Sequence, residues 1–98
     1  MSTEVTIRWA GPQDAAAITT LAALESRPVP NAPMLVAERD GTILAALPMG
    51  IGAPALADPF SHTGELVSLL ELRAEQLRRA EEPVRRRGLG RLRPAHLH

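Results

Sequence analysis

Two segments of this chain hold the residue types that could do chemistry. In the first, Ser61 and His62 closely follow Asp58, and serine, histidine and aspartate are the nucleophile, base and carboxylate of a hydrolytic triad. Residues this close in sequence, at the start of a helix, can rarely aim at one another as a triad requires. We therefore interpret Ser61 as a helix cap and predict no catalytic residue in the chain.

The second segment is the carboxyl end, where His96 and His98 flank Leu97. Histidine is a common metal ligand, but the sequence has no cysteine, which excludes thiolate nucleophiles and sulfur-based zinc sites. The third histidine, His62, is far away in the sequence. This spacing predicts no metal site.

The same end of the chain is strongly basic. Every basic residue is an arginine; residues 1–82 carry 11 acidic residues and six arginines, and residues 83–98 carry five arginines and no acid. The chain has no net charge, but residues 1–82 carry a net charge of −5 and residues 83–98 one of +5. Such a tail could contact the phosphates of nucleic acid or an anionic membrane surface, or stay a solvated end. It has no interleaved aromatic residues for base stacking, which disfavours nucleic acid without excluding it.

The elements that must position these residues follow from periodicity. Residues 5–9 alternate apolar and polar side chains and predict a strand. A helix over residues 12–26 should follow, because Pro12 suits a first helical position and Asp14 complements the helix dipole. Residues 34–38 and 42–47 flank an Asp-Gly pair and predict a hairpin, whose second strand is apolar on both faces and suits the centre of a sheet.

The second half of the chain predicts a short strand over residues 55–57 and a long helix over residues 61–82 that ends at Pro83. Its predicted buried stripe consists of Leu66, Leu69, Leu70, Leu77 and Ala80. The elements together predict an α/β fold of the α+β type: a small, mostly antiparallel sheet of three to four strands with two helices, in the order β-α-β-β-(β)-α. We expect one domain over residues 1–82 and a flexible, arginine-rich tail over residues 83–98.

The first half of the chain resembles the amino-terminal half of the GNAT N-acetyltransferase superfamily. The resemblance covers about residues 4–58 and is carried by Val5-Thr6-Ile7-Arg8, by Pro12-Gln13-Asp14-Ala15-Ala16-Ala17-Ile18 and by the hairpin sequence LVAERDGTILAAL of residues 35–47. It implies a GNAT-like sheet and, in complete members of the superfamily, transfer of an acetyl group from acetyl-CoA. The later strands that complete the cofactor cleft and supply a general acid have no room in 98 residues.

The resemblance also implies where a cofactor would bind. In the superfamily a glycine-rich loop between the fourth strand and a helix holds the cofactor pyrophosphate with its backbone N–H groups. The corresponding turn here, residues 58–64, has one glycine and an aspartate that would repel pyrophosphate. The letters of the loop motif occur instead in Arg85, Arg86, Arg87, Gly88 and Gly90, which are the only candidate contacts to acetyl-CoA that we can name, and we expect no bound cofactor.

Three functions follow as hypotheses. The first is a truncated GNAT-like domain without acetyl transfer that acts as a binding or interaction module, with a second copy or another protein as its partner. The second is a minimal acyl-CoA-binding, N-acetyltransferase-like protein that works as a dimer through residues 85–90. The third is an adaptor whose basic tail contacts an anionic partner.

The sequence also predicts a cytoplasmic location. Residues 1–5 lack the basic and apolar regions of a secretory signal. The longest uncharged segment, residues 43–57, is too short to span a bilayer.

Overall fold

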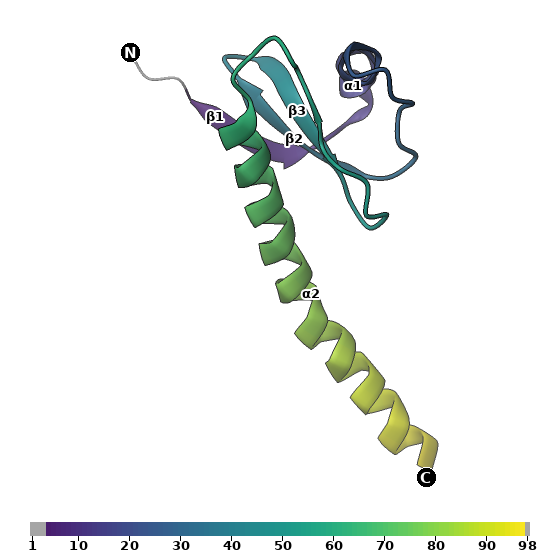
Figure 1. The fold of residues 1–98 in the computed structure, drawn as a ribbon. Helices are drawn as coiled ribbons and strands as arrows, with labels where there is room; N and C mark the ends of the chain where they lie inside the picture. The colour runs from purple at the N-terminus through teal and green to yellow at the C-terminus, as the bar shows by residue number, and fades with distance from the viewer. Residues whose placement is uncertain (1–3, 98) are drawn as a thin grey trace.

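In a computed structural model, the chain forms one antiparallel sheet and two helices (Figure 1). The structure describes the backbone of residues 4–97 and the side chains of residues 4–80. The elements in chain order are β1 (Val5–Trp9), the 3-10 turn η1 (Pro12–Asp14), α1 (Ala15–Leu24), β2 (Met34–Arg39), β3 (Thr42–Pro48), β4 (Leu56–Ala57) and α2 (Gly64–Leu97). The strands lie in the order β1-β2-β3-β4, and each neighbouring pair is antiparallel. The predicted fold class is confirmed.

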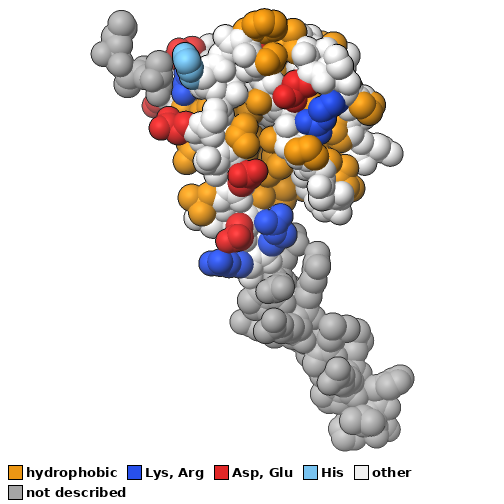
Figure 2. All heavy atoms as spheres, viewed as in Figure 1, with side chains coloured by type: hydrophobic (Ala, Val, Ile, Leu, Met, Phe, Trp, Pro, Cys, Tyr) orange, Lys and Arg blue, Asp and Glu red, His pale blue; other side chains and the backbone are white. Residues whose placement is uncertain are grey.

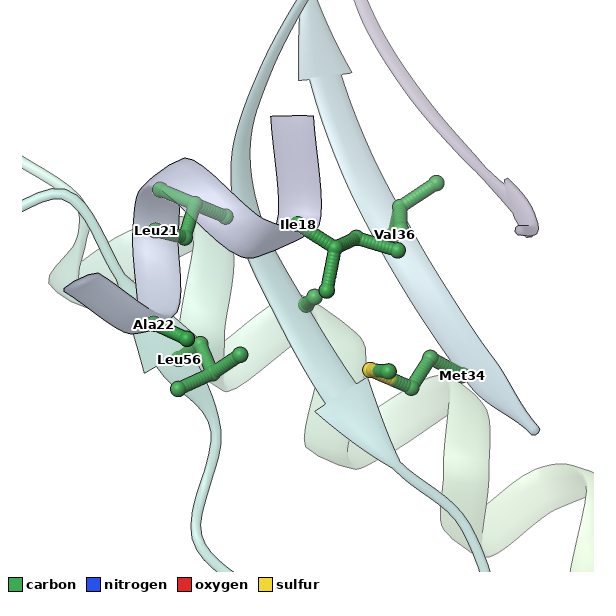
Figure 3. Close-up of a cluster of buried hydrophobic side chains, with 7 residues drawn as sticks. Ile18, Leu21, Ala22, Met34, Val36 and Leu56 are labelled. Carbon is green, nitrogen blue, oxygen red and sulfur yellow. The ribbon is translucent and has the colours of Figure 1, made fainter. Parts of the chain in front are cut away.

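The sheet lies between the two helices, because successive residues of a strand point to opposite faces. On β2, Met34 and Val36 pack against α1, whereas Leu35 and Ala37 pack against α2. Figure 3 shows the cluster on the α1 side, where Ile18, Leu21 and Ala22 of the helix meet Met34, Val36 and Leu56 of the sheet. The two central strands, β2 and β3, are therefore covered on both faces, which confirms the central place predicted for the second strand of the hairpin.

The turn between β2 and β3 confirms the predicted hairpin. Asp40 and Gly41 have φ angles of 52° and 80°, so both central residues lie in the left-handed region that a type I′ turn requires. A bulge between Ala37 and Glu38 shifts the register, so that Glu38 pairs with Ile43 while Ala37 pairs with Ala45. The bulge lies beside the end of the hairpin that forms the candidate site described below.

The buried stripe of α2 is narrower than predicted. Leu66, Leu70 and Ala74 are buried and Leu77 is partly buried, which is one row of side chains at helical spacing. Leu69 is 38% exposed, and Ala80 is exposed as well, so the prediction that these two are buried was wrong. A helix that lies on one sheet buries only the stripe that faces it, and Leu69 projects to the side of that stripe.

Two helix ends also differ from the prediction. The first helix begins as η1 and ends at Leu24, and Ser26 follows with a φ angle of 53°. We expected α2 to end at Pro83, but its backbone remains helical to Leu97. Proline removes one backbone donor, yet its fixed φ is a helical value. Within the described part of the chain, neither helix combines the length and the apolar composition that crossing a membrane requires.

Candidate functional site

An open cavity of about 480 Å³ lies on the α1 face of the sheet, beside the turn of the hairpin. One wall is formed by Gln13 of η1 and by Ala17, Thr20, Leu21 and Leu24 of α1. The strands supply Arg8, Glu38 and Ile43, and Asp58 lies at the rim. The site thus combines the apolar side chains of α1 with several polar and charged groups, which can orient a ligand.

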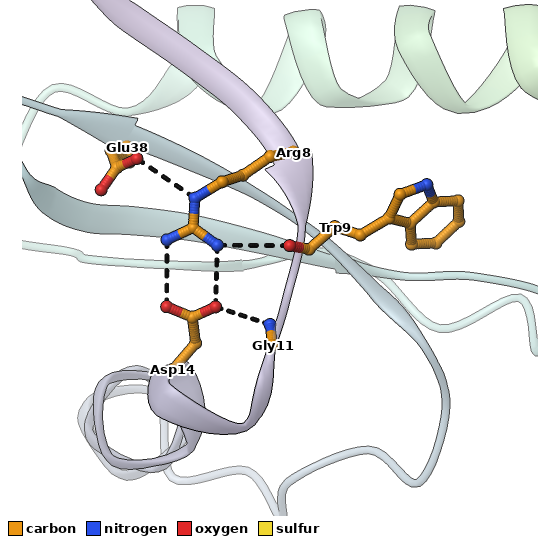
Figure 4. Close-up of polar contacts among 5 residues, drawn as sticks. All are labelled: Arg8, Trp9, Gly11, Asp14 and Glu38. Atoms are coloured by element: carbon orange, nitrogen blue, oxygen red, sulfur yellow. Dashed lines mark hydrogen bonds and ion pairs between the residues drawn. The ribbon is translucent and has the colours of Figure 1, made fainter.

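The charged part of the cavity is built around Arg8 of β1 (Figure 4). Its Nη1 and Nη2 donate to Oδ2 and Oδ1 of Asp14 at 2.8 and 3.0 Å, and its Nε donates to Oε1 of Glu38 at 3.2 Å. Asp14 Oδ2 also accepts the backbone N–H of Gly11 at 2.7 Å. The bidentate contact with Asp14 fixes the plane of the guanidinium group. Arg8 therefore links β1 to β2 and to the start of the first helix.

Asp14 carries its charge although the residue is only 4% exposed. The bonds from Arg8 and from the Gly11 N–H lower the pKa of its carboxyl from 3.8 to about 2. The bonds to Asp14 and then to Glu38 raise the pKa of Arg8 above its ordinary value. The pair therefore stays ionised at neutral pH, and Arg8 is a structural cation rather than a group held ready for an anionic ligand.

The charges that line the cavity favour a cation. Three carboxylates, on Asp14, Glu38 and Asp58, face a single guanidinium, on Arg8. Arg8 bonds Oε1 of Glu38, and no bond to the other oxygen occurs among the described side chains. Glu38 can therefore accept a further hydrogen bond from a donor that enters the cavity.

The turn between β4 and α2 is the place where the resemblance puts a cofactor loop. Asp58 Oδ1 accepts the backbone N–H of Phe60 at 2.8 Å, and the carbonyl of Asp58 accepts the N–H of Ser61 at 3.3 Å. The first helical bond of α2 runs from Val67 N–H to the carbonyl of Thr63 at 2.9 Å. Asp58 thus uses two amides of the turn, and Glu65 places a negative charge in the first turn of α2.

The prediction that Ser61 caps the helix was wrong. Its hydroxyl donates to Asp58 Oδ2 at 3.3 Å, and the helix begins three residues later, at Gly64. This Asx-type turn is the physical reason, because the aspartate holds the next residues in a turn and delays the helix. The hydroxyl of Ser61 is thus bonded to Asp58 rather than to His62, which is exposed.

A second ionic contact joins the end of α1 to β4, and sequence reasoning missed it. Arg27 donates to the carbonyls of Ala55 and Pro54 at 2.8 and 2.7 Å. Glu25 Oε1 accepts the N–H of Ala57 at 3.2 Å. This contact holds β4, and with it Asp58, beside the cavity.

The remaining predicted residues fall into two groups. Arg85, Arg86, Arg87, Gly88 and Gly90, like His96 and His98, lie outside the residues whose side chains the structure describes. Trp9, on the edge strand β1, is 50% exposed. Within the described residues, no group of three potential metal ligands comes together.

Sequence reasoning treated Asp14 only as a charge near a helix start and did not connect it with Arg8 or Glu38. The signal that could have found them is an arginine in an alternating strand, followed six residues later by an aspartate in a first helical turn. Comparison with known proteins found no matching family model, no similar curated protein and no similar solved structure.

Proposed function

We propose that this chain is a truncated GNAT-like domain that acts as a binding module without acetyl transfer, and that its ligand enters the cavity beside α1. The observation that carries the proposal is the cavity itself, which pairs the apolar wall of α1 with a surplus of negative charge from Glu38 and Asp58. Charged groups of one sign in a concave site raise the local concentration of ligands of the opposite sign. The ligand class is therefore a small molecule or side chain with a cationic head and a short apolar stem.

The turn before α2 supports the absence of acetyl transfer. A pyrophosphate needs several backbone N–H donors at a helix start. Here the N–H groups of Phe60 and Ser61 already bond to Asp58, and the carboxylates of Asp58 and Glu65 repel an anion. Binding acetyl-CoA in this turn would require breaking these bonds and burying like charges beside one another.

A matched pair of probes tests the ligand class. We would titrate the protein with n-butylammonium and with butyrate, which have similar stems and opposite charges, and follow the backbone amide resonances by NMR. The cation should give saturable shifts at Ala17, Gly41 and Thr42, which line the cavity, and butyrate should not. Equal shifts from both probes, or shifts elsewhere only, would exclude a cation site here.

Two variants sharpen this test. Glu38→Gln keeps an oxygen for the Nε of Arg8 but removes the charge. It should lower the affinity for n-butylammonium by about fivefold, which corresponds to the loss of one contact between unit charges in water. Asp40→Asn is the matched control, because Asp40 lies in the hairpin turn but does not line the cavity, and asparagine tolerates its positive φ. If both variants lowered the affinity equally, the cause would be the net charge of the protein and not the position of Glu38 in the cavity.

Calorimetric titration with acetyl-CoA separates the proposal from the acyl-CoA hypothesis. We expect no saturable heat. Saturable binding in the micromolar range would favour the acyl-CoA-binding hypothesis over the proposed binding module. Loss of that binding in a variant with Arg85, Arg86 and Arg87 replaced by Ala would then locate the cofactor at residues 85–90.

A further inference from the structure

We propose that the free edge of β1 pairs with the β1 strand of a second copy of this chain, antiparallel and about a two-fold axis at Ile7, so that one sheet runs through both copies. This inference concerns a different surface from the cavity and does not depend on the proposed ligand. Figure 1 shows β1 at the edge of the sheet. It is the outermost strand in the order β1-β2-β3-β4.

The hydrogen bonds of β1 show which of its backbone groups point outward. The N–H of Ala10 donates to the carbonyl of Met34 at 2.8 Å, so position 10 belongs to the residues that bond to β2. Bonding and non-bonding pairs alternate along an antiparallel ladder. In the register of β1 and β2, the bonded positions are thus 6, 8 and 10, and Val5, Ile7 and Trp9 direct their N–H and C=O groups to the free edge.

A two-fold axis at Ile7 uses all three outward positions. Ile7 then faces Ile7 of the second copy, and Val5 faces its Trp9 on either side of the axis. Each of these pairs exchanges two N–H···O=C bonds. An axis at position 6 or 8 would pair only two of the outward positions and leave one of them unbonded.

The side chains fit the same register. Trp9, Ile7 and Val5 share the α2 face of β1, since their partners Leu35 and Ala37 pack against α2 and Val5 and Ile7 contact that cluster. Figure 4 shows the Trp9 indole pointing away from Arg8. The axis at Ile7 places each half-exposed indole against a β-branched valine, which is a favourable cross-strand pair.

The opposite face of β1 also distinguishes the registers. With the axis at Ile7, Arg8 faces Thr6 of the second copy, so no like charges meet. With the axis at position 8, two Arg8 side chains would lie directly opposite each other, which is destabilising. Charge therefore selects the same register as the backbone bonds.

Among the described residues, no strand pairs with the outer edge of β1. Of the two helices, α2 packs mainly on β2 and β3, and α1 packs on β2, β3 and β4. The five residues of β1 include no lysine and no proline, and no bulge is present in its pairing with β2. Its one charged residue, Arg8, is bonded to Asp14 and Glu38. The other edge strand, β4, has only two residues, with Pro54 and Pro59 close on either side, so it offers a poor template.

The mass of the assembly in solution is the first test. Sedimentation at high micromolar concentration should give twice the chain mass of 10.5 kDa. Trp9→Lys places an edge charge opposite Val5 of the second copy and should give the single-chain mass, while an unchanged circular dichroism spectrum shows that it folds. Leu24→Lys, at an exposed leucine on α1, is the matched control and should remain a dimer. A single-chain mass for the wild-type protein would overturn the proposal.

Crosslinking gives an independent test that does not require a lysine in the sheet. Because the chain has no cysteine, Ile7→Cys introduces one thiol, and the axis brings two copies of it to a Cα separation of about 5.5 Å, within disulfide range. Mild oxidation should give covalent dimers of this variant and none of Thr19→Cys, on the exposed side of α1. A dimer that survives Trp9→Lys and fails to crosslink at position 7 uses another surface and refutes this one.

Discussion

The two faces of the sheet are built from the same strands but have opposite characters. On the α2 face, Leu66, Leu70 and Ala74 lie over Leu35 and Leu47 in a dry apolar layer. On the α1 face, an apolar cluster gives way toward the hairpin turn to an ionic network and an open cavity. Because successive side chains of a strand point to opposite faces, the same strands contribute to an apolar core on one face and to the candidate site on the other.

The difference arises from the helix that covers each face. With ten residues, α1 is about 15 Å long, whereas β2, with six residues, is about 20 Å long. The face stays open along the flank of α1, where Ala17, Leu21 and Leu24 line the cavity. In that part the chain places Arg8, Asp14 and Glu38 instead of apolar side chains; Arg8 pairs with both carboxylates and leaves one negative charge in excess. The flank of α1 is thus the place where a ligand can enter.

The largest expected effect is on the α2 face. Leu70→Ala removes a fully buried side chain at the centre of the dry layer and should lower the free energy of unfolding by about 2 to 5 kcal/mol. Urea or thermal denaturation measures it. The loss has two parts, the lost transfer of the side chain from water and the space that its neighbours fail to fill.

Leu72→Ala is the control for that prediction, because Leu72 lies on the same helix and is 55% exposed. It should change the free energy of unfolding by about 0.5 kcal/mol or less, as surface substitutions usually do. Equal losses in the two variants would mean that α2 does not lie on the sheet by the stripe of Leu66, Leu70 and Ala74.

The next effect, on the α1 face, depends on pH. The pKa of Asp14 is about 2 in the folded protein against an ordinary value of 3.8, so the folded state binds its proton less readily. The stabilisation is fully present above about pH 4 and is lost as the pH falls toward 2. Asp14→Asn should be less stable than the wild type at neutral pH, and the difference should shrink over this window, as urea denaturation at a series of pH values would show.

The control for this window is a carboxylate on the other side of the molecule. Glu75 pairs with Arg79 on an exposed part of α2. Glu75→Gln should therefore keep the fall in the free energy of unfolding between pH 4 and pH 2 that Asp14 causes. A difference between Asp14→Asn and the wild type that stays constant down to pH 2 would show that the carboxylate is not held by Arg8 in the folded protein.

The elements that the sequence predicts well are those whose cause is local. The hairpin follows from Asp40 and Gly41, because few other residues adopt positive φ angles at two successive positions. The central place of β3 follows from apolar residues on both of its faces. Neither inference needs any knowledge of which helix lies where.

The features that sequence reasoning missed depend on contacts across the fold. Arg8 and Glu38 are 30 positions apart and meet only because β1 and β2 pair in one register. The exposure of Leu69 depends on how α2 is rotated on the sheet, and helical spacing alone accepts it as buried. The late start of α2 depends on Asp58, whose bonds to Phe60 and Ser61 compete with the helix.

The smallest expected effect concerns the exposed surface of α2. Figure 2 shows acidic and basic side chains gathered there just before the grey part of the chain, and Glu75 Oε1 lies 3.0 Å from Nη2 of Arg79. Both side chains are mostly in water, so Glu75→Gln should lower the free energy of unfolding by only about 0.3 to 0.5 kcal/mol, and added salt should abolish the difference. Denaturation at low and high salt measures both. A loss that persists in high salt would mean that Glu75 is shielded from solvent by something that lies on α2. The contrast between a partly buried ionic network on the α1 face and exposed charges on α2 would then fail.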